Sequence, residues 1–348
     1  VMGLFDGFDG MKGSGAEIAE LIGIPVVLVL NAKSTAYTVA PVLYGFKHFY
    51  PGIRVVGVVF NFVASVAHYA YLQQACADAG VEALGYIPKD ESIVIPSRHL
   101  GLSIDETFCF DTFADRVAEV IDKTVNVDRL LELCTVEFSG EQTEDVVCFG
   151  NRKIAIARDE AFNFMYRENV EALKRAGEVV FFSPLRDKSL PEADMVYFPG
   201  GYPELHLAEL AANEGMRQSV RKYCENGGRV LAECGGMMYL CDTITDGDGK
   251  VYPMAGVLKQ GATMEQMKLK LGYREVRVNG QRIRGHEFHY SRILPANEKI
   301  PVIGTIYNAK DMVVDTPVYT YKNVLASYIH FYWGECGIDH FLMLMSQK

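Results

Sequence analysis

Short apolar runs alternate with amphipathic stretches along most of the chain, and this pattern predicts an α/β fold. In the first half, the apolar runs at 24–30, 55–60 and 82–86 are typical of buried strands. Stretches with helical character lie between or before them, at residues 16–22, 39–48 and 68–79. Strands that alternate with helices in this way are typical of a doubly wound parallel sheet.

A polar segment at 135–151 divides the pattern into two parts. It contains Ser-Gly-Glu-Gln-Thr-Glu-Asp and has no apolar period, so we interpret it as a linker between domains 1–134 and 152–348. A long helix is expected before it, over 104–133. The second domain opens a new α/β series, with strands expected at 154–157 and 179–183 and helices at 162–176 and 205–226.

The sequence Gly-Arg-Val-Leu-Ala-Glu-Cys-Gly-Gly-Met-Met-Tyr-Leu at 228–240 predicts a nucleophile elbow. An apolar strand leads directly into Cys234, and two glycines allow a sharp turn into an apolar helix. The N–H groups at the start of that helix are expected to lower the pKa of the thiol. A buried structural cysteine at a strand end is the alternative, but the Cys-Gly-Gly context favours a nucleophile.

A second glycine pair follows another apolar run. Gly200 and Gly201 come after Met-Val-Tyr-Phe-Pro, and the ends of parallel strands meet at one edge of a sheet. The backbone N–H groups of Gly201 and Gly235 could therefore stabilise an oxyanion beside Cys234. Taken alone, the glycine pair would be interpreted as an ordinary turn.

His330 is the candidate base for a cysteine nucleophile. It ends the strand-like run Val-Leu-Ala-Ser-Tyr-Ile-His at 324–330, and a Cys–His pair need not be close in sequence. His286 and His289 occur in Gly-His-Glu-Phe-His-Tyr-Ser, whose H-E-x-H spacing differs from the H-E-x-x-H of zinc proteases. We therefore expect these two histidines to be structural or to line a pocket, and no tightly bound metal.

These motifs together resemble a known family. The elbow, the Pro-Gly-Gly loop, Gly-His-Glu-Phe-His-Tyr-Ser and Ala-Ser-Tyr-Ile-His look like the class I, cobyric-type glutamine amidotransferase domain. Val-Met-Gly-Leu-Phe-Asp-Gly at the start, Gly-Val-Val-Phe-Asn at 57–61 and Pro-Ser-Arg-His-Leu-Gly-Leu at 96–102 resemble cobyrinic acid a,c-diamide synthases. The resemblance implies that one domain takes ammonia from glutamine. The other would use ATP and Mg²⁺ to activate the a and c carboxylates of cobyrinic or hydrogenobyrinic acid.

Three residues of the first domain are candidates for that second activity. Asp6 could bind Mg²⁺ or the acceptor, although Asp-Gly is also a common turn pair. Asn61 could contact an adenine edge, and Arg98 a phosphate or carboxylate. An ordinary turn asparagine and a solvated arginine are the alternatives at these two positions.

The chain departs from the family pattern in two places. It has no G-x-x-x-x-G-K-[ST] phosphate-binding loop, which the family carries upstream of the segment matching Val1. We therefore expect a fragment with a truncated, P-loop NTPase-like (dethiobiotin-synthetase-like) parallel sheet. Many triad amidotransferases have a glutamate two residues after the histidine, but Tyr332 stands there. Cys234 and His330 would then act as a dyad, or another carboxylate such as Glu335 would orient the histidine.

Two other functions remain open from the sequence. The same family fold serves nickel sirohydrochlorin a,c-diamide synthases, and the residues do not decide the acceptor. A protein that lacks the ATP site altogether would be a glutaminase or a tetrapyrrole-binding protein without ligase activity.

Composition restricts the partners. A net charge of −10 over 348 residues argues against nucleic acid, and the apolar runs are too short to span a bilayer. No signal-peptide pattern is present, and the eight cysteines lack paired short spacings. A reactive thiol must stay reduced, so we expect a cytoplasmic protein. Glutamine and a tetrapyrrole acid are its expected partners, and it could form a homodimer.

Overall fold

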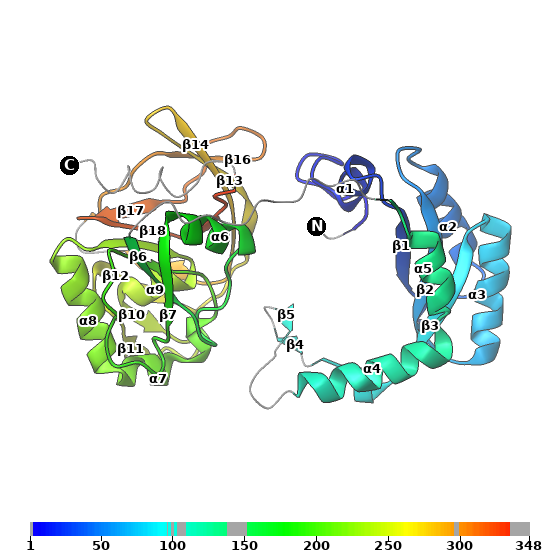
Figure 1. The fold of residues 1–348 in the computed structure, drawn as a ribbon, viewed down its shortest axis with the longest axis horizontal. Helices are drawn as coiled ribbons and strands as arrows, with labels where there is room; N and C mark the ends of the chain where they lie inside the picture. Colours follow the sequence, from blue (N-terminus) through cyan, green and yellow to red (C-terminus); the bar gives the residue numbers. More distant parts are fainter. Residues whose placement is uncertain are drawn as a thin grey trace. The chain divides into compact units, whose positions relative to one another are not determined.

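The computed structural model describes residues 3–95, 97–98, 101–102, 109–137, 152–295 and 299–334, with the backbone alone for 97–98 and 101–102. The chain divides into two compact units, Val1–Gln142 and Thr143–Lys348. Figure 1 shows the elements of both units. Each unit has its own hydrophobic core. Most of the predicted linker, from 138 onward, lies outside the described residues.

Unit 1 contains a parallel sheet in the order β1-β2-β3. Its strands are β1 Val26–Asn31, β2 Val55–Val63 and β3 Glu82–Pro88. Helices and short elements complete the unit: α1 Gly15–Leu21, α2 Val39–His48, α3 Val66–Ala79, η1 Glu91–Ile93, β4 Ser97–Arg98 and β5 Gly101–Leu102. Leu43, Phe60 and Leu72 are fully buried between the sheet and its helices. The predicted parallel α/β arrangement is confirmed here.

The predicted helix over 104–133 is wrong in its length. The structure has two helices, α4 Phe110–Thr124 and α5 Val127–Cys134, and residues 103–108 lie outside the described part. The break falls at Asn126, whose N–H donates to the Leu84 carbonyl at 2.8 Å. Its side chain accepts a hydrogen bond from the Arg129 N–H and so caps the second helix. A contact with β3 therefore interrupts an otherwise continuous helical pattern.

Unit 2 is built on a larger sheet in the order β17-β18-β9-β8-β6-β7. All neighbouring strands in it are parallel except β17 and β18. The strands are β6 Arg152–Ala157, β7 Gly177–Phe182, β8 Met195–Phe198, β9 Arg229–Glu233, β17 Val318–Tyr321 and β18 Val324–Ser327. The carboxyl ends of β8 and β9 lie side by side, which places the two predicted glycine loops together.

The helices of unit 2 are shorter than the sequence predicts. They are α6 Arg167–Ala176, η2 Pro203–Leu205, α7 Leu207–Ala212, α8 Glu214–Glu225 and α9 Gly235–Leu240. The predicted helix 205–226 is interrupted at Asn213, whose amide donates to the carbonyls of Pro184 and Asp187. These tertiary hydrogen bonds hold the chain out of helical geometry between α7 and α8.

Two smaller sheets cover unit 2. One has the order β11-β10-β12-β15 and the other β16-β13-β14-β19. Their strands are β10 Cys241–Thr245, β11 Val251–Pro253, β12 Leu258–Thr263, β13 Lys270–Val278, β14 Gln281–His289, β15 Arg292–Ile293, β16 Thr305–Asn308 and β19 Ile329–Phe331. The single strand predicted at 324–330 is wrong, because β18 pairs with β9 whereas β19 pairs with β14. The chain changes sheets at Tyr328.

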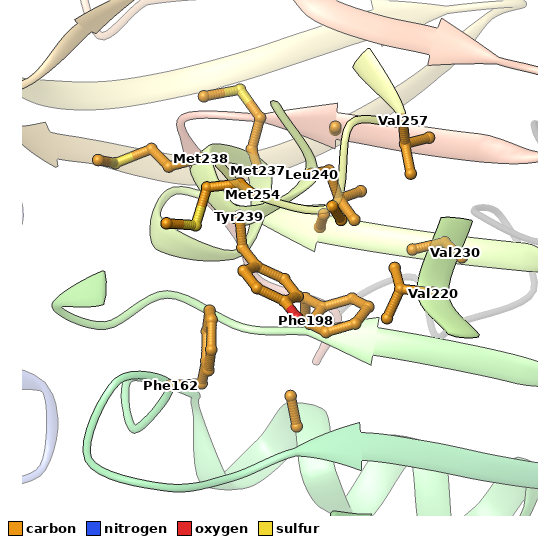
Figure 2. Close-up of a cluster of buried hydrophobic side chains, with 14 of the residues drawn as sticks. Phe162, Phe198, Val220, Val230, Met237, Met238, Tyr239, Leu240, Met254 and Val257 are labelled. Carbon is orange, nitrogen blue, oxygen red and sulfur yellow. The ribbon is translucent and has the colours of Figure 1, made fainter. Parts of the chain in front are cut away.

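The core of unit 2 supports the elbow from below. Every residue of α9 is buried, which is typical of a helix that is apolar on all sides. Figure 2 shows Tyr239 of this helix beside Phe162 and Phe198. Its ring centroid lies 5.5 Å from that of Phe162 and 5.6 Å from that of Phe198. No helix in the described part of the chain is both long and apolar enough to cross a membrane.

The substitution Gly236→Ala should destabilise unit 2. A methyl group at Gly236 would overlap the carbonyl of Phe198, so the elbow helix would have to move away from β8. We expect a loss of about 1–3 kcal/mol and a fall in Tm of about 2–10 °C, measured by thermal unfolding. Gly247→Ala is the matched control, because a methyl group there meets nothing within 4 Å. Equal Tm values for the two variants would contradict the packing argument.

Candidate active site

Cys234 occupies the sharp turn between β9 and α9. Its backbone has φ 46° and ψ −107°, a conformation that residues other than glycine rarely adopt. The Cys234 N–H donates to the Ser327 carbonyl at 2.7 Å, which continues the pairing of β9 with β18. Strained backbone of this kind persists only where the surrounding structure holds it. The structure thus contains the strand-to-helix turn that the sequence predicts.

The second glycine loop packs directly against this turn. A Cβ on Gly235 would lie 3.2 Å from the Gly201 nitrogen and 2.7 Å from the Pro203 ring, so the two loops are in close contact. The N–H groups of Gly201 and Gly235 are not donated to another backbone carbonyl among the described residues. Two backbone donors that have no carbonyl partner and lie beside a cysteine provide the geometry of an oxyanion site.

His330 lies on β19 and reaches the same place from the other sheet. A methyl group at Gly200 would overlap the His330 ring, so the imidazole rests against the glycine loop. The structure therefore brings together Cys234, Gly200, Gly201, Gly235 and His330. The Cys234 sulfur approaches the Phe288 carbonyl at 4.0 Å, and within the described residues it makes no hydrogen bond to His330.

The environment of the thiol differs from the sequence expectation. Burial raises the pKa of Cys234 above its usual range, and the negative charge of Glu204 raises it further. The Gly235 N–H does lower this pKa, as expected for a helix start, but the effect is smaller than that of burial. The expected low thiol pKa is therefore wrong for the free protein, because the sequence does not reveal how deeply the sulfur is buried.

The environment of the imidazole shifts its proton affinity in the opposite direction. Burial lowers the pKa of His330 to about 3, and the charges that His286 and His289 would carry lower it as well. At neutral pH the free site thus holds a neutral thiol and a neutral imidazole. Such a pair can react only by moving the thiol proton to the imidazole as the sulfur attacks.

Comparison with known proteins agrees with this geometry. Residues 153–336 match the family model of the CobB/CobQ-like glutamine amidotransferase domain. A cobyrinate a,c-diamide synthase of Salmonella typhimurium is 35% identical over 96% of this chain and 77% of the relative. The protein of the same name from Caldanaerobacter subterraneus is 37% identical over 98% of this chain and 79% of the relative. A hydrogenobyrinate a,c-diamide synthase of Pseudomonas aeruginosa is 37% identical, over 95% and 74%.

The chain belongs to the cobyrinate a,c-diamide synthase family. The family model covers all five residues that meet at the elbow, so the geometric site lies inside the matched domain. The α/β fold with an amidotransferase domain that the resemblance implied is confirmed.

Two acidic residues near the cysteine were missed by the sequence analysis. Glu204 follows Pro203 in η2, and burial raises the pKa of its carboxyl group to about 7. Glu233 directly precedes the cysteine, and burial raises its pKa to about 8. It accepts hydrogen bonds from the Tyr197 hydroxyl at 2.7 Å and the Phe331 N–H at 3.1 Å. Glu233 occurs in the motif at 228–240, and Glu204 follows Gly201 by three residues. Only burial distinguishes the two from ordinary surface glutamates.

A third acidic residue, Glu287, anchors the strand that carries the histidine motif. Its fully buried carboxylate accepts hydrogen bonds from Arg274 at 2.7 Å and from His289 and Thr316 at 2.8 Å. Burial acts to raise the pKa of Glu287, but the His289 and Thr316 hydrogen bonds and the charges of Lys270 and Arg274 hold it at about 2. This network ties β13 and β14 together beside the site.

The two other histidines of the motif are used in different ways. His286 stacks on His330, with centroids 4.8 Å apart and an angle of 14°. His289 stacks on Tyr328, at 3.6 Å and 5°. Their rings therefore lie in two separate stacks. Within the described residues no group of three or more His, Cys, Asp or Glu side chains could hold a metal.

The candidates of unit 1 are less well placed than those of unit 2. Asp6 is exposed in a turn in which its N–H donates to the Gly3 carbonyl. Asn61 lies inside β2, which extends to Val63, and its side chain accepts a hydrogen bond from the Phe62 N–H. Arg98 lies in β4, but its side chain is outside the described part, as is Glu335.

Alkylation should reveal the raised thiol pKa. We expect the rate of iodoacetamide reaction at Cys234 to rise steadily with alkaline pH, without the plateau at about pH 5–7 that a thiolate–imidazolium pair produces. Peptide mapping by mass spectrometry measures the rate at each cysteine, and exposed Cys109 serves as the internal reference. A plateau at Cys234 in that range would show a preformed ion pair and contradict the neutral state.

The substitution Glu204→Gln should make Cys234 more reactive. It removes a charge that raises the thiol pKa, so the thiolate fraction increases. At about pH 8, where Glu204 is ionised, we expect alkylation to be about threefold to tenfold faster. Glu209→Gln, in the next helix and exposed, is the matched control and should leave the rate unchanged. Unchanged reactivity of the Glu204 variant would show that its charge does not reach the sulfur.

Proposed function

We propose that this protein takes ammonia from glutamine and uses it to amidate the a and c side-chain carboxylates of cobyrinic or hydrogenobyrinic acid. The observation that carries the proposal is that Cys234 and the two glycine loops, at the carboxyl ends of β8 and β9, meet His330 from the neighbouring sheet. The names of the relatives, cobyrinate and hydrogenobyrinate a,c-diamide synthase, support the acceptor.

The amidotransferase step follows from the local geometry. The Cys234 sulfur attacks the side-chain amide carbon of glutamine, and His330 accepts the thiol proton. The N–H groups of Gly201 and Gly235 donate to the oxyanion that forms. His330 then gives the proton to the departing nitrogen, the C–N bond breaks, and ammonia leaves. Water hydrolyses the remaining thioester to glutamate and regenerates the thiol.

Burial explains why the thiol of Cys234 would react slowly until glutamine binds. The free thiol and imidazole are both neutral, because burial raises the pKa of one and lowers that of the other. A glutamine carries an α-ammonium group, which would offset the negative charge of Glu204 near the sulfur. The structure thus gives a physical reason for low thiol reactivity in the absence of glutamine.

The amidation step belongs to unit 1 in this proposal. ATP would activate the acceptor carboxylate as an acyl phosphate, and ammonia would displace the phosphate. The described residues around Asp6 do not by themselves form a metal site, so we derive no step through Mg²⁺. Asp6, Asn61 and Arg98 stay candidates for binding ATP, Mg²⁺ or the acceptor, on the basis of the family relationship.

The deciding experiment compares the full chain with its Cys234→Ser variant. Each is incubated with cobyrinic acid, ATP and Mg²⁺, with either glutamine or ammonium chloride as the nitrogen source. Glutamate release and the mass of the acceptor are followed. We expect the variant to lose glutamine hydrolysis by a factor of at least about 10³, whereas any ammonia-dependent amidation that the wild-type chain performs should be retained in the variant. Parallel reactions with hydrogenobyrinic acid and nickel sirohydrochlorin identify the preferred acceptor.

Other outcomes would change the conclusion in defined ways. Glutamine hydrolysis without amidation from either nitrogen source would limit the function of this chain to that of a glutaminase. Preference for nickel sirohydrochlorin would replace the acceptor. Retention of glutamine hydrolysis in the Cys234→Ser variant would refute the role of the cysteine.

A further inference from the structure

The imidazole of His330 has no carboxylate partner in the described part of the chain. Its Nδ1 atom is buried and makes no hydrogen bond. Glu233 is close in the fold, but one of its oxygens accepts from the Tyr197 hydroxyl and the other from the Phe331 N–H. A Cys–His site usually needs a group that orients the histidine and stabilises its protonated form. That group must be sought among uncharged neighbours.

Two aromatic rings contact His330 instead, and two more pack against these. The rings in contact with His330 are those of Phe164 and His286, and the rings of Tyr166 and Tyr332 pack next to them. The His286 ring stacks on the His330 ring at 4.8 Å, and the edge contact from Phe164 is at 4.5 Å. Tyr332 stands at the position where many triad enzymes carry a glutamate, and its ring packs edge-on against Tyr166 at 5.6 Å.

The Tyr166 hydroxyl fixes the orientation of the His286 ring. The hydroxyl oxygen lies 2.6 Å from His286 Nδ1. Burial raises the pKa of Tyr166 to about 12, so the hydroxyl keeps its proton, and burial lowers the pKa of His286, so its ring is neutral. A hydrogen bond between two neutral groups therefore joins the Tyr166 hydroxyl to His286 Nδ1 and holds the ring in place.

The backbone holds the two histidines in this arrangement. His286 and His330 are directly opposite each other in the antiparallel pairing of β14 with β19. A methyl group at Gly285 would overlap the His330 carbonyl, so only glycine permits the strands to approach this closely. On another side, Gly200 leaves room for the His330 ring. The stack is thus set by strand register and by two glycines.

We propose that His286 is a positioning residue, held by the Tyr166 hydroxyl, whose neutral ring orients the His330 imidazole and stabilises it when protonated, in place of a triad carboxylate. The face of an aromatic ring attracts a cation, and a stack with 14° between the planes presents that face to the imidazolium. His286 does not contact the reacting atoms in this account. The inference rests on the proposed hydrolysis of glutamine by Cys234 and His330.

The test compares variants of the full chain for glutamine hydrolysis. His286→Ala removes the stacked ring, and we expect kcat to fall about tenfold to a hundredfold with the KM for glutamine within about twofold. His286→Phe restores a flat ring and should recover most of the lost kcat.

A second variant tests the hydroxyl that holds the ring. Tyr166→Phe frees the His286 ring and should lower kcat about threefold to tenfold. Tyr321→Phe is its matched control, since it deletes a hydroxyl bonded to surface Glu225. Thermal unfolding checks that each variant is folded.

The outcomes separate this inference from the proposed function. If the wild-type chain neither hydrolyses glutamine nor reacts at Cys234 with the glutamine analogue 6-diazo-5-oxo-L-norleucine, the proposed function fails and the inference fails with it. If the wild type is active and His286→Ala equals it in kcat, only the inference fails. Equal losses in His286→Ala and His286→Phe would overturn the role of stacking. A loss of similar size in Glu335→Gln would show that a carboxylate orients His330.

Discussion

The backbone of Cys234 is the constraint on which the site depends. Its positive φ is held by the hydrogen bond to Ser327, which is possible because β18 lies beside β9 in the sheet. The same neighbour strand then leads through Tyr328 to His330, so the interaction that strains the cysteine also delivers the histidine. Gly236 against Phe198 completes the support from the other side. A loss of any of these contacts would relax the turn and separate the groups.

Burial is the second determinant of the chemistry. It disfavours both the thiolate of Cys234 and the imidazolium of His330. The nucleophile and the base are therefore both uncharged in the free site. A neutral thiol reacts slowly with electrophiles, so the cysteine is protected when no glutamine is bound. Burial also means that stabilisation of charge must come from groups already in place when glutamine binds, namely the backbone donors and the stacked ring of His286.

The buried carboxylate of Glu287 links this chemistry to the fold. Its ties to Arg274, His289 and Thr316 fix the end of β14 at the point where the Phe288 carbonyl faces the Cys234 sulfur. On the same strand His286 supports His330. One strand thus carries a charged network and an uncharged ring stack, and the geometry of the site depends on both. Removing the carboxylate would leave the buried guanidinium of Arg274 without its charged partner.

The sequence by itself determined the α/β class, the elbow at Cys234 and the family, because glycine pairs at strand ends and period-2 or helical patterns are local features. It also named His330, although it placed this residue at the end of one strand. Only the tertiary structure decided that the chain changes sheets at Tyr328, that Asn126 and Asn213 break the helices, and that His286 stacks on His330. It alone revealed the raised pKa of Cys234. These features depend on pairing between distant segments and on burial, neither of which is a property of neighbouring residues.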